Sequence, residues 1–174
     1  PLVGHGARNL VDRAVGGDDA ALRERVLAGL RARYLDAPVV HTVPFPGAHP
    51  ALALLRDAGV ALAVATNKPL PITTRILERL DLAPFFVLVE GGREGMPLKP
   101  APDMLLAAME RAGVEAARAA MVGDSTVDLD TARAAGCRFV GVGFGMDRGR
   151  GLTAAGVSPL HQDLRDVARA VLAA

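Results

Sequence analysis

Short apolar runs alternate with helical segments from residue 48 onward, and this alternation restricts the fold more than any other feature of the chain. The apolar runs are of strand length and cover residues 60–65, 85–89, 119–122 and 138–142. The helical patterns around them cover residues 48–58, 70–80, 102–112, 127–135 and 164–173. Strands that are apolar throughout and separated by helices form parallel sheets with both faces covered. We therefore predict an α/β fold in which an open parallel sheet is sandwiched between helices.

The chain before residue 48 has a different pattern. Residues 6–35 carry apolar side chains at spacings of three and four, which predict two helices packed on each other. A connector rich in proline follows at residues 38–50 and is the best candidate for a domain boundary. We expect residues 1–44 to form a helical unit and residues 45–174 to form the α/β core, with residues 157–160 as a candidate fifth strand.

The composition is that of a folded protein without a nucleic-acid partner. Of the 174 residues 51% are hydrophobic and 22% are charged, and the net charge is +1, whereas binding a phosphate backbone normally needs a marked basic excess. The single cysteine, Cys137, fits a reducing compartment. No apolar stretch reaches the length of a signal peptide or a bilayer span. We expect a cytoplasmic protein that binds neither nucleic acid nor a membrane.

Polar side chains gather where the predicted strands end. Thr66 and Asn67 follow the first strand, and Asp124 follows the third, with Ser125 and Asp128 behind it. In open α/β sheets, ligands bind beyond these carboxyl ends. Two carboxylates suit Mg²⁺, and amides at the start of the helix near Ser125 suit anionic oxygen. The alternative is that Asp124 and Ser125 only cap that helix.

Lysine is rare in this chain, which contains 20 basic residues. Only Lys68 and Lys99 are lysines, and each precedes a proline just after an apolar run. In so arginine-rich a chain, both are candidates for positions that need a compact ammonium group instead of a planar guanidinium. Lys99 lies in the loop after the second strand, so we group it with Thr66 and Asp124 as a phosphate-binding set.

Three motifs in this order resemble the second, third and fourth motifs of the haloacid dehalogenase-like superfamily. They are Ala65-Thr66-Asn67-Lys68-Pro69, Lys99-Pro100-Ala101-Pro102, and Val122-Gly123-Asp124-Ser125 with Asp128. Three further segments resemble the bacterial phosphoglycolate phosphatase branch, namely Gly4-His5-Gly6, Pro46-Gly47 and the glycine-rich stretch 141–145. The resemblance covers essentially the whole chain and implies the Rossmann-like core of that superfamily with a helical cap.

The resemblance implies a Mg²⁺-dependent phosphatase that works through an aspartyl-phosphate intermediate. Thr66 would bind the transferring phosphoryl group with Asn67 beside it, Lys99 would neutralise charge, and Asp124 with Asp128 would hold the metal directly or through water. A carboxylate nucleophile divides one difficult displacement into two easier ones, and cations stabilise charge on the phosphoryl oxygens.

The helices before residue 38 resemble part of the cap that closes over the site in this superfamily. Cap residues would then select the substrate. His5 and Arg8 could meet a substrate carboxylate, and the alternative is that both are ordinary surface residues.

The first motif of the superfamily, Asp-x-Asp-Gly-Thr at the end of a first strand, has no match in these residues. Its first aspartate would be the nucleophile, and its strand would lie in the middle of the sheet, between the strands ending at Thr66 and Asp124. We weigh three accounts: a preceding segment of the protein, a strand supplied by rearrangement or by exchange in a homodimer, and a degenerate relative. We expect the 174 residues alone to hydrolyse no phosphate ester.

The leading prediction is a phosphatase of a small phosphorylated metabolite, with 2-phosphoglycolate first. One alternative is a phosphatase for another sugar phosphate, because cap residues decide the substrate. The other alternative is a non-catalytic module that binds phosphate or metal. An upstream strand ending in two aspartates would favour the enzyme over the binding module.

Overall fold

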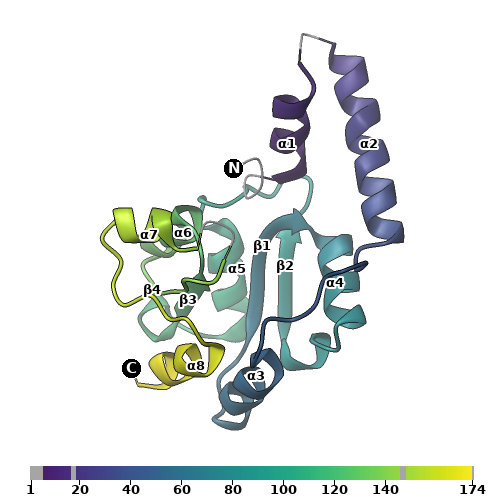
Figure 1. The fold of residues 1–174 in the computed structure, drawn as a ribbon. Helices are drawn as coiled ribbons and strands as arrows, with labels where there is room; N and C mark the ends of the chain where they lie inside the picture. The colour runs from purple at the N-terminus through teal and green to yellow at the C-terminus, as the bar shows by residue number, and fades with distance from the viewer. Residues whose placement is uncertain (1–5, 17–18, 146–147, 174) are drawn as a thin grey trace.

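Two pairs of parallel strands form the centre of the molecule. The computed structural model describes residues 6–16, 19–145 and 148–173. Strand β1 (Ala63–Pro69) pairs with β2 (Leu88–Gly92), starting with Ala63 opposite Leu88, and β3 (Ala120–Gly123) pairs with β4 (Arg138–Gly141). Each pair is a separate sheet of two strands. Figure 1 shows β1 and β2 standing beside the β3–β4 pair.

Helices cover both strand pairs. The helices that follow the first connector are α3 (Ala48–Asp57), α4 (Leu70–Arg79), α5 (Asp103–Ala112), α6 (Thr126–Ala135), α7 (Arg150–Ala154) and α8 (Leu164–Leu172), with short 3-10 turns at Ala83–Phe85 and Ala116–Arg118. Helices α4 and α5 both contact β1 and β2, and they lie on opposite sides of this pair (Figure 1). Helix α6 contacts β3 and β4. These contacts confirm the predicted α/β fold with helices packed over parallel strands.

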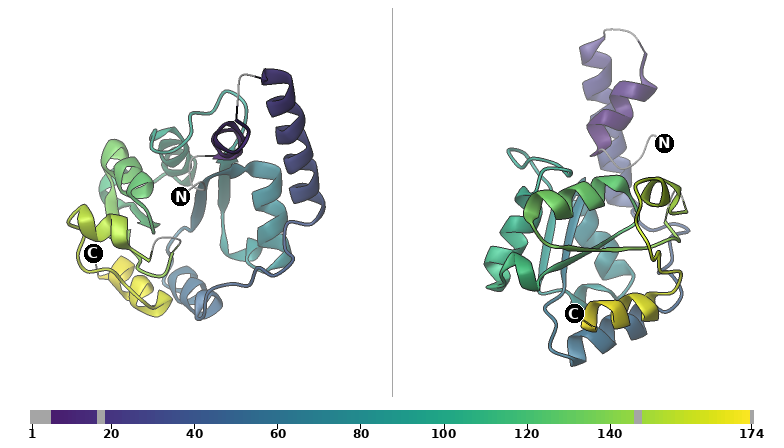
Figure 2. Two further views of the ribbon diagram at one scale, coloured as in Figure 1. Left: turned by 45° about the horizontal axis from the view of Figure 1, so that its top comes forward. Right: turned by 90° about the vertical axis from the view of Figure 1, so that its left-hand side faces the viewer.

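A helical hairpin projects from this core. Its arms are α1 (Gly6–Ala14) and α2 (Ala20–Asp36), which pack against each other. The side chain of Asp19 accepts a hydrogen bond from the amide of Leu22 at 2.8 Å and so caps the start of α2. Helix α1 contacts β1 and α2 contacts α4, so the hairpin stands over the carboxyl end of β1 (Figure 2). The domain boundary near residue 44 stays a prediction.

The described strands leave the gap that the sequence analysis places in the middle of the sheet. Strands β1 and β3 do not pair with each other, and each is the edge of its own two-stranded sheet. This is the interval in which the sequence resemblance places a further strand. No described residue forms a strand there.

Several predicted boundaries also differ from the observed ones. Strand β1 begins at Ala63 instead of residue 60, because the amide of Val60 donates to the carbonyl of Leu55 at 3.0 Å and closes the end of α3. Strand β2 begins at Leu88, since the 3-10 turn takes up the start of its apolar run. Residues 157–160 are not a strand, and pairing in this region is limited to one bridge between Val142 and His161.

Helix α8 joins the two halves of the core. In one apolar cluster, Ala168 packs with Ala51 and Leu55 of α3. In a second cluster, Val167 packs with Val140 and Val142 around β4. The last helix of the chain therefore holds the beginning of the core against its final strand, although these segments lie far apart in sequence.

Gly91 marks the closest approach between β2 and the start of α4. A Cβ atom at this position would lie 2.7 Å from the Cα of Leu70 and 2.9 Å from its amide nitrogen. Backbone atoms cannot move aside as a flexible side chain can. Gly29 in α2 is the opposite case, because nothing lies within 4 Å of its ideal Cβ position.

We expect Gly91→Ala to lower the free energy of unfolding by about 1–3 kcal/mol through overpacking. Gly29→Ala is the matched control and should raise it by up to about 1 kcal/mol, because alanine favours the helix over glycine. Urea unfolding followed by circular dichroism measures both changes. An unchanged midpoint for Gly91→Ala would contradict the close approach of these two segments.

Candidate active site

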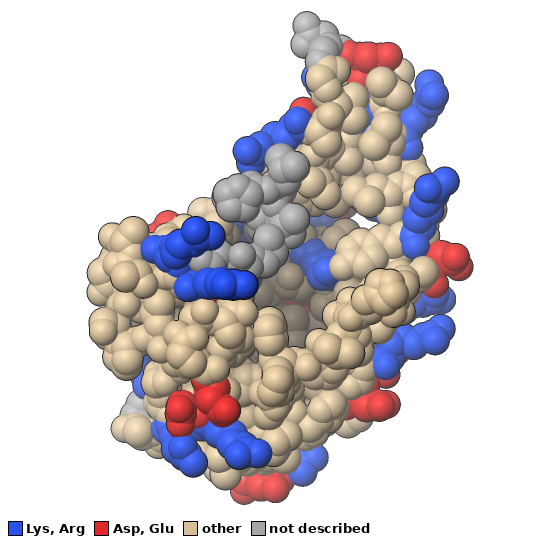
Figure 3. All heavy atoms as spheres, in the orientation of Figure 1, with Lys and Arg blue, Asp and Glu red and all other residues tan. Residues whose placement is uncertain are grey.

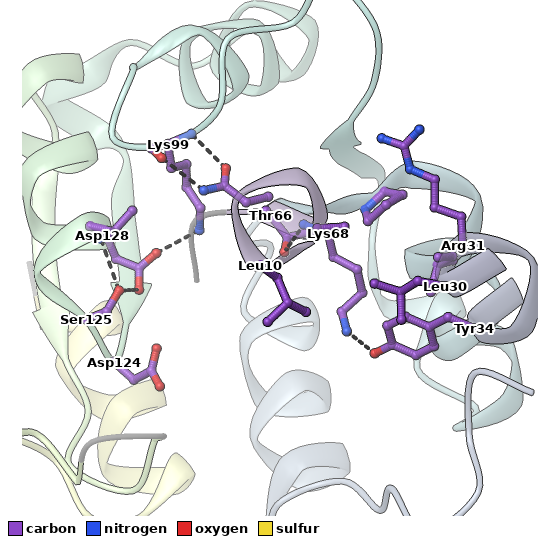
Figure 4. Close-up of a pocket in the computed structure, with 16 residues that line it drawn as sticks. Leu10, Leu30, Arg31, Tyr34, Thr66, Lys68, Lys99, Asp124, Ser125 and Asp128 are labelled. Atoms are coloured by element: carbon purple, nitrogen blue, oxygen red, sulfur yellow. Dashed lines mark hydrogen bonds and ion pairs between the residues drawn. The ribbon is translucent and has the colours of Figure 1, made fainter. Parts of the chain in front are cut away.

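A cavity of about 430 Å³ opens between the helical hairpin and the carboxyl ends of β1 and β3. Its lining comes from α1, α2, the end of β1, the first turn of α4, the loop before α5, the loop after β3 and the start of α6. The space-filling view shows the molecule hollowed below the hairpin (Figure 3). The close-up shows the polar side chains of β1, of the loop before α5 and of α6 around this cavity (Figure 4). It is therefore the place where the predicted site residues meet.

Asn67 fixes the loop that carries Lys99. The Nδ2 group of Asn67 donates to the carbonyl oxygen of Lys99 at 2.9 Å, and the Lys99 amide donates to Oδ1 of Asn67 at 2.7 Å. This two-point contact joins the end of β1 to a loop 32 residues further along the chain. Asn67 is buried, and its amide is engaged in holding Lys99. Its position thus supports a role in orienting Lys99, beside the substrate contact predicted from the sequence.

Lys99 and Asp128 form the most enclosed ion pair that crosses the site. The Nζ of Lys99 lies 2.7 Å from Oδ1 of Asp128, and the two side chains are only 11% and 10% exposed. The hydroxyl of Ser125 donates to Oδ2 of Asp128 at 2.7 Å. Both carboxylate oxygens of Asp128 therefore have partners, and the ammonium group of Lys99 has a fixed position.

Two glycines leave the room that the two carboxylates occupy. A Cβ on Gly123 would lie 2.4 Å from the Cβ of Asp128, and a Cβ on Gly145 would lie 1.8 Å from Oδ2 of Asp124. Any larger residue would displace the acid beside it. Gly123 before Asp124 and Gly145 in the loop after β4 are thus glycines because a side chain there would collide with one of the two acids.

Ser125 also caps the helix that carries Asp128. Its backbone is extended, and its hydroxyl oxygen is the side-chain acceptor for the amide of Asp128 at the start of α6. The helix-capping alternative is therefore correct for Ser125 and does not exclude a role in the site, because the same side chain lines the cavity.

Thr66 lines the cavity from the end of β1. Its hydroxyl oxygen accepts a hydrogen bond from the amide of Lys68 at 3.2 Å. A threonine hydroxyl that accepts this bond keeps its own proton for donation to a ligand.

Six of the eight residues predicted for the site line one cavity. They are Thr66, Asn67, Lys99, Asp124, Ser125 and Asp128. They come from three stretches of chain that the sequence alone places at the ends of strands, and the fold brings these ends together. Their catalytic and binding roles stay predictions.

Arg8 does not belong to the cavity lining. Its guanidinium lies 2.5 Å from Oε1 of Glu24 on the outside of the hairpin, where both side chains are more than half exposed. This hydrogen bond lowers the pKa of Glu24 and raises the pKa of Arg8. The arrangement gives no support to contact between Arg8 and a substrate carboxylate, because Arg8 already has a carboxylate partner. His5 lies outside the described residues.

Two residues of α2 contribute to the cavity without having been predicted. Arg31 and Tyr34 line it from the hairpin, and Tyr34 touches Lys68 of β1. Lys68 had a signal in the sequence, since it is one of only two lysines. Tyr34 is the single tyrosine of the chain. Helical periodicity places it on α2 but cannot show which part of the core that face meets.

The donors fit a magnesium ion that completes its coordination with water and substrate oxygens. Mg²⁺ is usually held by one or two carboxylates plus substrate phosphate. Asp124 and Asp128 are the two acids among the described residues that line the cavity. The backbone of Gly145 lies against Asp124, and the backbone of Gly123 lies against Asp128. Among the described residues, no cluster of three or more acid, histidine or cysteine side chains is placed to hold a metal. The fit is therefore to a two-carboxylate site and not to a cage made of protein alone.

Comparison with known proteins decides the family. The model of the haloacid dehalogenase-like hydrolases matches residues 2–136. The chain belongs to this family. It is 37% identical over 169 residues to a phosphoglycolate phosphatase of Pseudomonas putida, covering 94% of this chain and 62% of the relative. It is 40% identical over 148 residues to a phosphoglycolate phosphatase of Neisseria meningitidis, covering 82% of this chain and 63% of the relative.

The fold agrees with that assignment. A solved structure from Lactobacillus delbrueckii subsp. bulgaricus, assigned as a phosphoglycolate phosphatase, superposes with a TM-score of 0.85 at 27% identity and covers 98% of this chain and 80% of that chain. The 174 residues span less than two thirds of the length of the two bacterial relatives named above. Among the described helices, none combines the length and apolar character that crossing a bilayer requires.

The enclosed ion pair gives a prediction about stability. Lys99→Met leaves the Asp128 carboxylate enclosed without its cation, and this should lower the free energy of unfolding of the full-length protein by about 3 kcal/mol. The double variant Lys99→Met/Asp128→Asn should lose at least about 1 kcal/mol less than the sum of the two single variants, because the pair acts as a unit. Urea unfolding of all four proteins gives the coupling energy.

The exposed pair Arg133 and Asp130 on the same helix is the matched control. Its atoms lie 3.5 Å apart and both side chains are more than half exposed, so its coupling should stay below about 0.5 kcal/mol. Equal coupling in the two pairs would contradict the special position of Lys99.

Proposed function

We propose that the complete protein is a Mg²⁺-dependent phosphatase of a small phosphorylated metabolite, with 2-phosphoglycolate as the leading substrate. The observation that carries the proposal is the convergence of Thr66, Lys99 and Asp124 on one cavity. A hydroxyl donor, an ammonium group and a carboxylate are the groups that a phosphate ester with a bound cation requires. The relatives that bear the phosphoglycolate phosphatase name support the choice of substrate.

Each group of the cavity has a distinct task in this proposal. Thr66 donates a hydrogen bond to a non-bridging oxygen of the phosphoryl group. Lys99, which Asn67 and Asp128 hold in place, neutralises charge on the phosphoryl oxygens and the nucleophile. Asp124 holds the cation directly, and Asp128 acts through water, because both of its oxygens already accept hydrogen bonds from protein groups. When bound, Mg²⁺ would withdraw charge from the phosphoryl oxygens.

The nucleophile belongs to an aspartate outside these 174 residues. In the proposed first step its carboxylate oxygen bonds to phosphorus, the ester bond breaks, and the departing oxygen takes a proton from the second aspartate of the same motif. Water then hydrolyses the aspartyl-phosphate. Support comes from the absence of the first motif from these residues and from the unpaired edges of β1 and β3 beside the cavity.

Three alternatives give different results in a direct assay. A phosphatase for another sugar phosphate would turn over that ester faster than 2-phosphoglycolate. A non-catalytic module would bind phosphate or metal through the same cavity without releasing phosphate. Strand exchange in a homodimer would supply the missing strand from a second copy, and it would make activity of the 174 residues depend on protein concentration.

We expect Asp124→Asn in the full-length protein to abolish Mg²⁺-stimulated release of phosphate from 2-phosphoglycolate. The rate of release should fall by at least about 100-fold, which is the loss expected when one charge-stabilising group is removed. Chelation of the metal by EDTA should have the same effect on the unchanged protein. Asp130→Asn is the matched control, since Asp130 lies nearby on α6 with an exposed side chain and does not line the cavity. Undiminished turnover by Asp124→Asn would place the cation elsewhere.

A further inference from the structure

Lys68 and Tyr34 form a polar contact at the end of the cavity that the hairpin covers. The Nζ of Lys68 donates a hydrogen bond to the hydroxyl oxygen of Tyr34 and lies 4.6 Å from the centre of the tyrosine ring. Figure 4 shows the lysine side chain extending away from the Lys99 and Asp128 pair to reach this hydroxyl. Both residues line the cavity. The contact joins β1 of the core to α2 of the hairpin, and no step proposed above uses it.

The two lysines of the cavity differ in how their charge is balanced. Lys99 has a carboxylate, Asp128, at 2.7 Å. None of the ion pairs formed by the described residues involves Lys68, and the hydrogen-bond partner of its ammonium group is the neutral hydroxyl of Tyr34. A cation that faces a cavity without a carboxylate partner attracts an anionic ligand group.

The walls around Lys68 strengthen this attraction. Leu10, Leu30 and Ile72 line the same cavity, and their side chains reduce contact with water. A charge interaction in such surroundings is stronger than one on the open surface. A ligand that places an anionic group here therefore gains more than it would at an exposed lysine.

Hydrogen bonds remain for such a ligand. An ammonium group has three donor hydrogens, and Lys68 gives one to Tyr34. The tyrosine hydroxyl accepts that bond and keeps its own proton for donation. Arg31 also lines the cavity, but Figure 4 shows its guanidinium pointing away from Lys68 and Tyr34, so we leave it out of this pair.

The pair lies in the same cavity as the proposed phosphoryl position. Thr66 and Lys68 are two residues apart at the irregular end of β1, where the Lys68 amide lies 3.2 Å from Oγ1 of Thr66. A compound with a phosphoryl group at Thr66 and Lys99 can place a second anionic group at Lys68 only if a few atoms separate the two. This length suits the phosphate ester of a short hydroxy acid.

We propose that Lys68 and Tyr34 form a specificity subsite that binds a carboxylate on the substrate. The inference rests on the proposed phosphatase function and adds the two residues that would select phosphate esters of short hydroxy acids. It also gives the hairpin a part in recognition, because Tyr34 belongs to the hairpin and Lys68 belongs to the core.

The test compares two esters that differ in one charge. 2-Phosphoglycolate carries a carboxylate, and 2-hydroxyethyl phosphate has a hydroxymethyl group in its place. In the full-length protein, Lys68→Met should raise KM for 2-phosphoglycolate by about 10-fold to 100-fold, the value of one or two lost charged hydrogen bonds. The same variant should change KM for 2-hydroxyethyl phosphate by less than about 3-fold. Tyr34→Phe should act in the same direction with a smaller effect.

Two controls separate recognition from folding. Lys68→Arg keeps the positive charge and should retain part of the preference for 2-phosphoglycolate. Arg79→Met removes a cation from the exposed end of α4 and should change neither KM. An equal loss for both esters in Lys68→Met would mean that the contact only fastens the hairpin, and it would overturn the subsite. An unchanged preference would overturn it as well.

Binding measured without turnover keeps the subsite distinct from the proposed function. Isothermal titration of each ester into protein without Mg²⁺ should show tighter binding of 2-phosphoglycolate, and Lys68→Met should remove that preference. If the unchanged protein hydrolyses neither ester but shows this pattern, the phosphatase proposal fails and the subsite stands. If it hydrolyses both esters and Lys68→Met binds and hydrolyses them as before, the phosphatase proposal stands and the subsite fails.

Discussion

The enclosed contact between Lys99 and Asp128 is the interaction on which the rest of the site depends. It connects the loop before α5 to α6, and Asn67 extends the connection to the end of β1. Removing either charge would leave the other enclosed without compensation, which costs more than an exposed pair ever contributes. This mutual dependence holds an ammonium group at one point between two strand pairs that, among the described residues, belong to separate sheets.

The separation of the two strand pairs explains why side chains must carry so much of the site. In a continuous sheet the backbone ladder sets the distance between the ends of neighbouring strands. Here β1 and β3 belong to different sheets, and α8 holds the outer elements together by packing on both α3 and β4. Across the cavity the distance is bridged by Asn67, Lys99 and Asp128.

Sequence reasoning predicted the parts of the site that depend on position along one strand or helix. Thr66 and Asp124 follow apolar runs, and both line the cavity beyond the carboxyl ends of the strands, where ligands bind in open α/β sheets. Both Nδ2 and Oδ1 of Asn67 bond to the backbone of Lys99. This contact could not be predicted, because it depends on how a loop 32 residues further along the chain comes back to the end of β1. Tyr34 was missed for the same reason, since helical periodicity does not show which core residue a helix of the hairpin will touch. Arg8 was a candidate for a substrate carboxylate with an ordinary surface residue as the alternative, and in the structure it pairs with Glu24.

The scarcity of lysine now has a physical explanation. Arginine supplies almost all of the basic residues of the chain. Lysine is found only at Lys68 and Lys99, and both line the cavity described above. A guanidinium group is planar and binds best as a fork, whereas an ammonium group is a compact charge that can donate in three directions. Lys99 meets Asp128 within an enclosed space, and Lys68 bonds to Tyr34 with one of its three hydrogens. An arginine could satisfy the first partner of each pair, but its planar head fixes the directions in which its remaining hydrogens can donate.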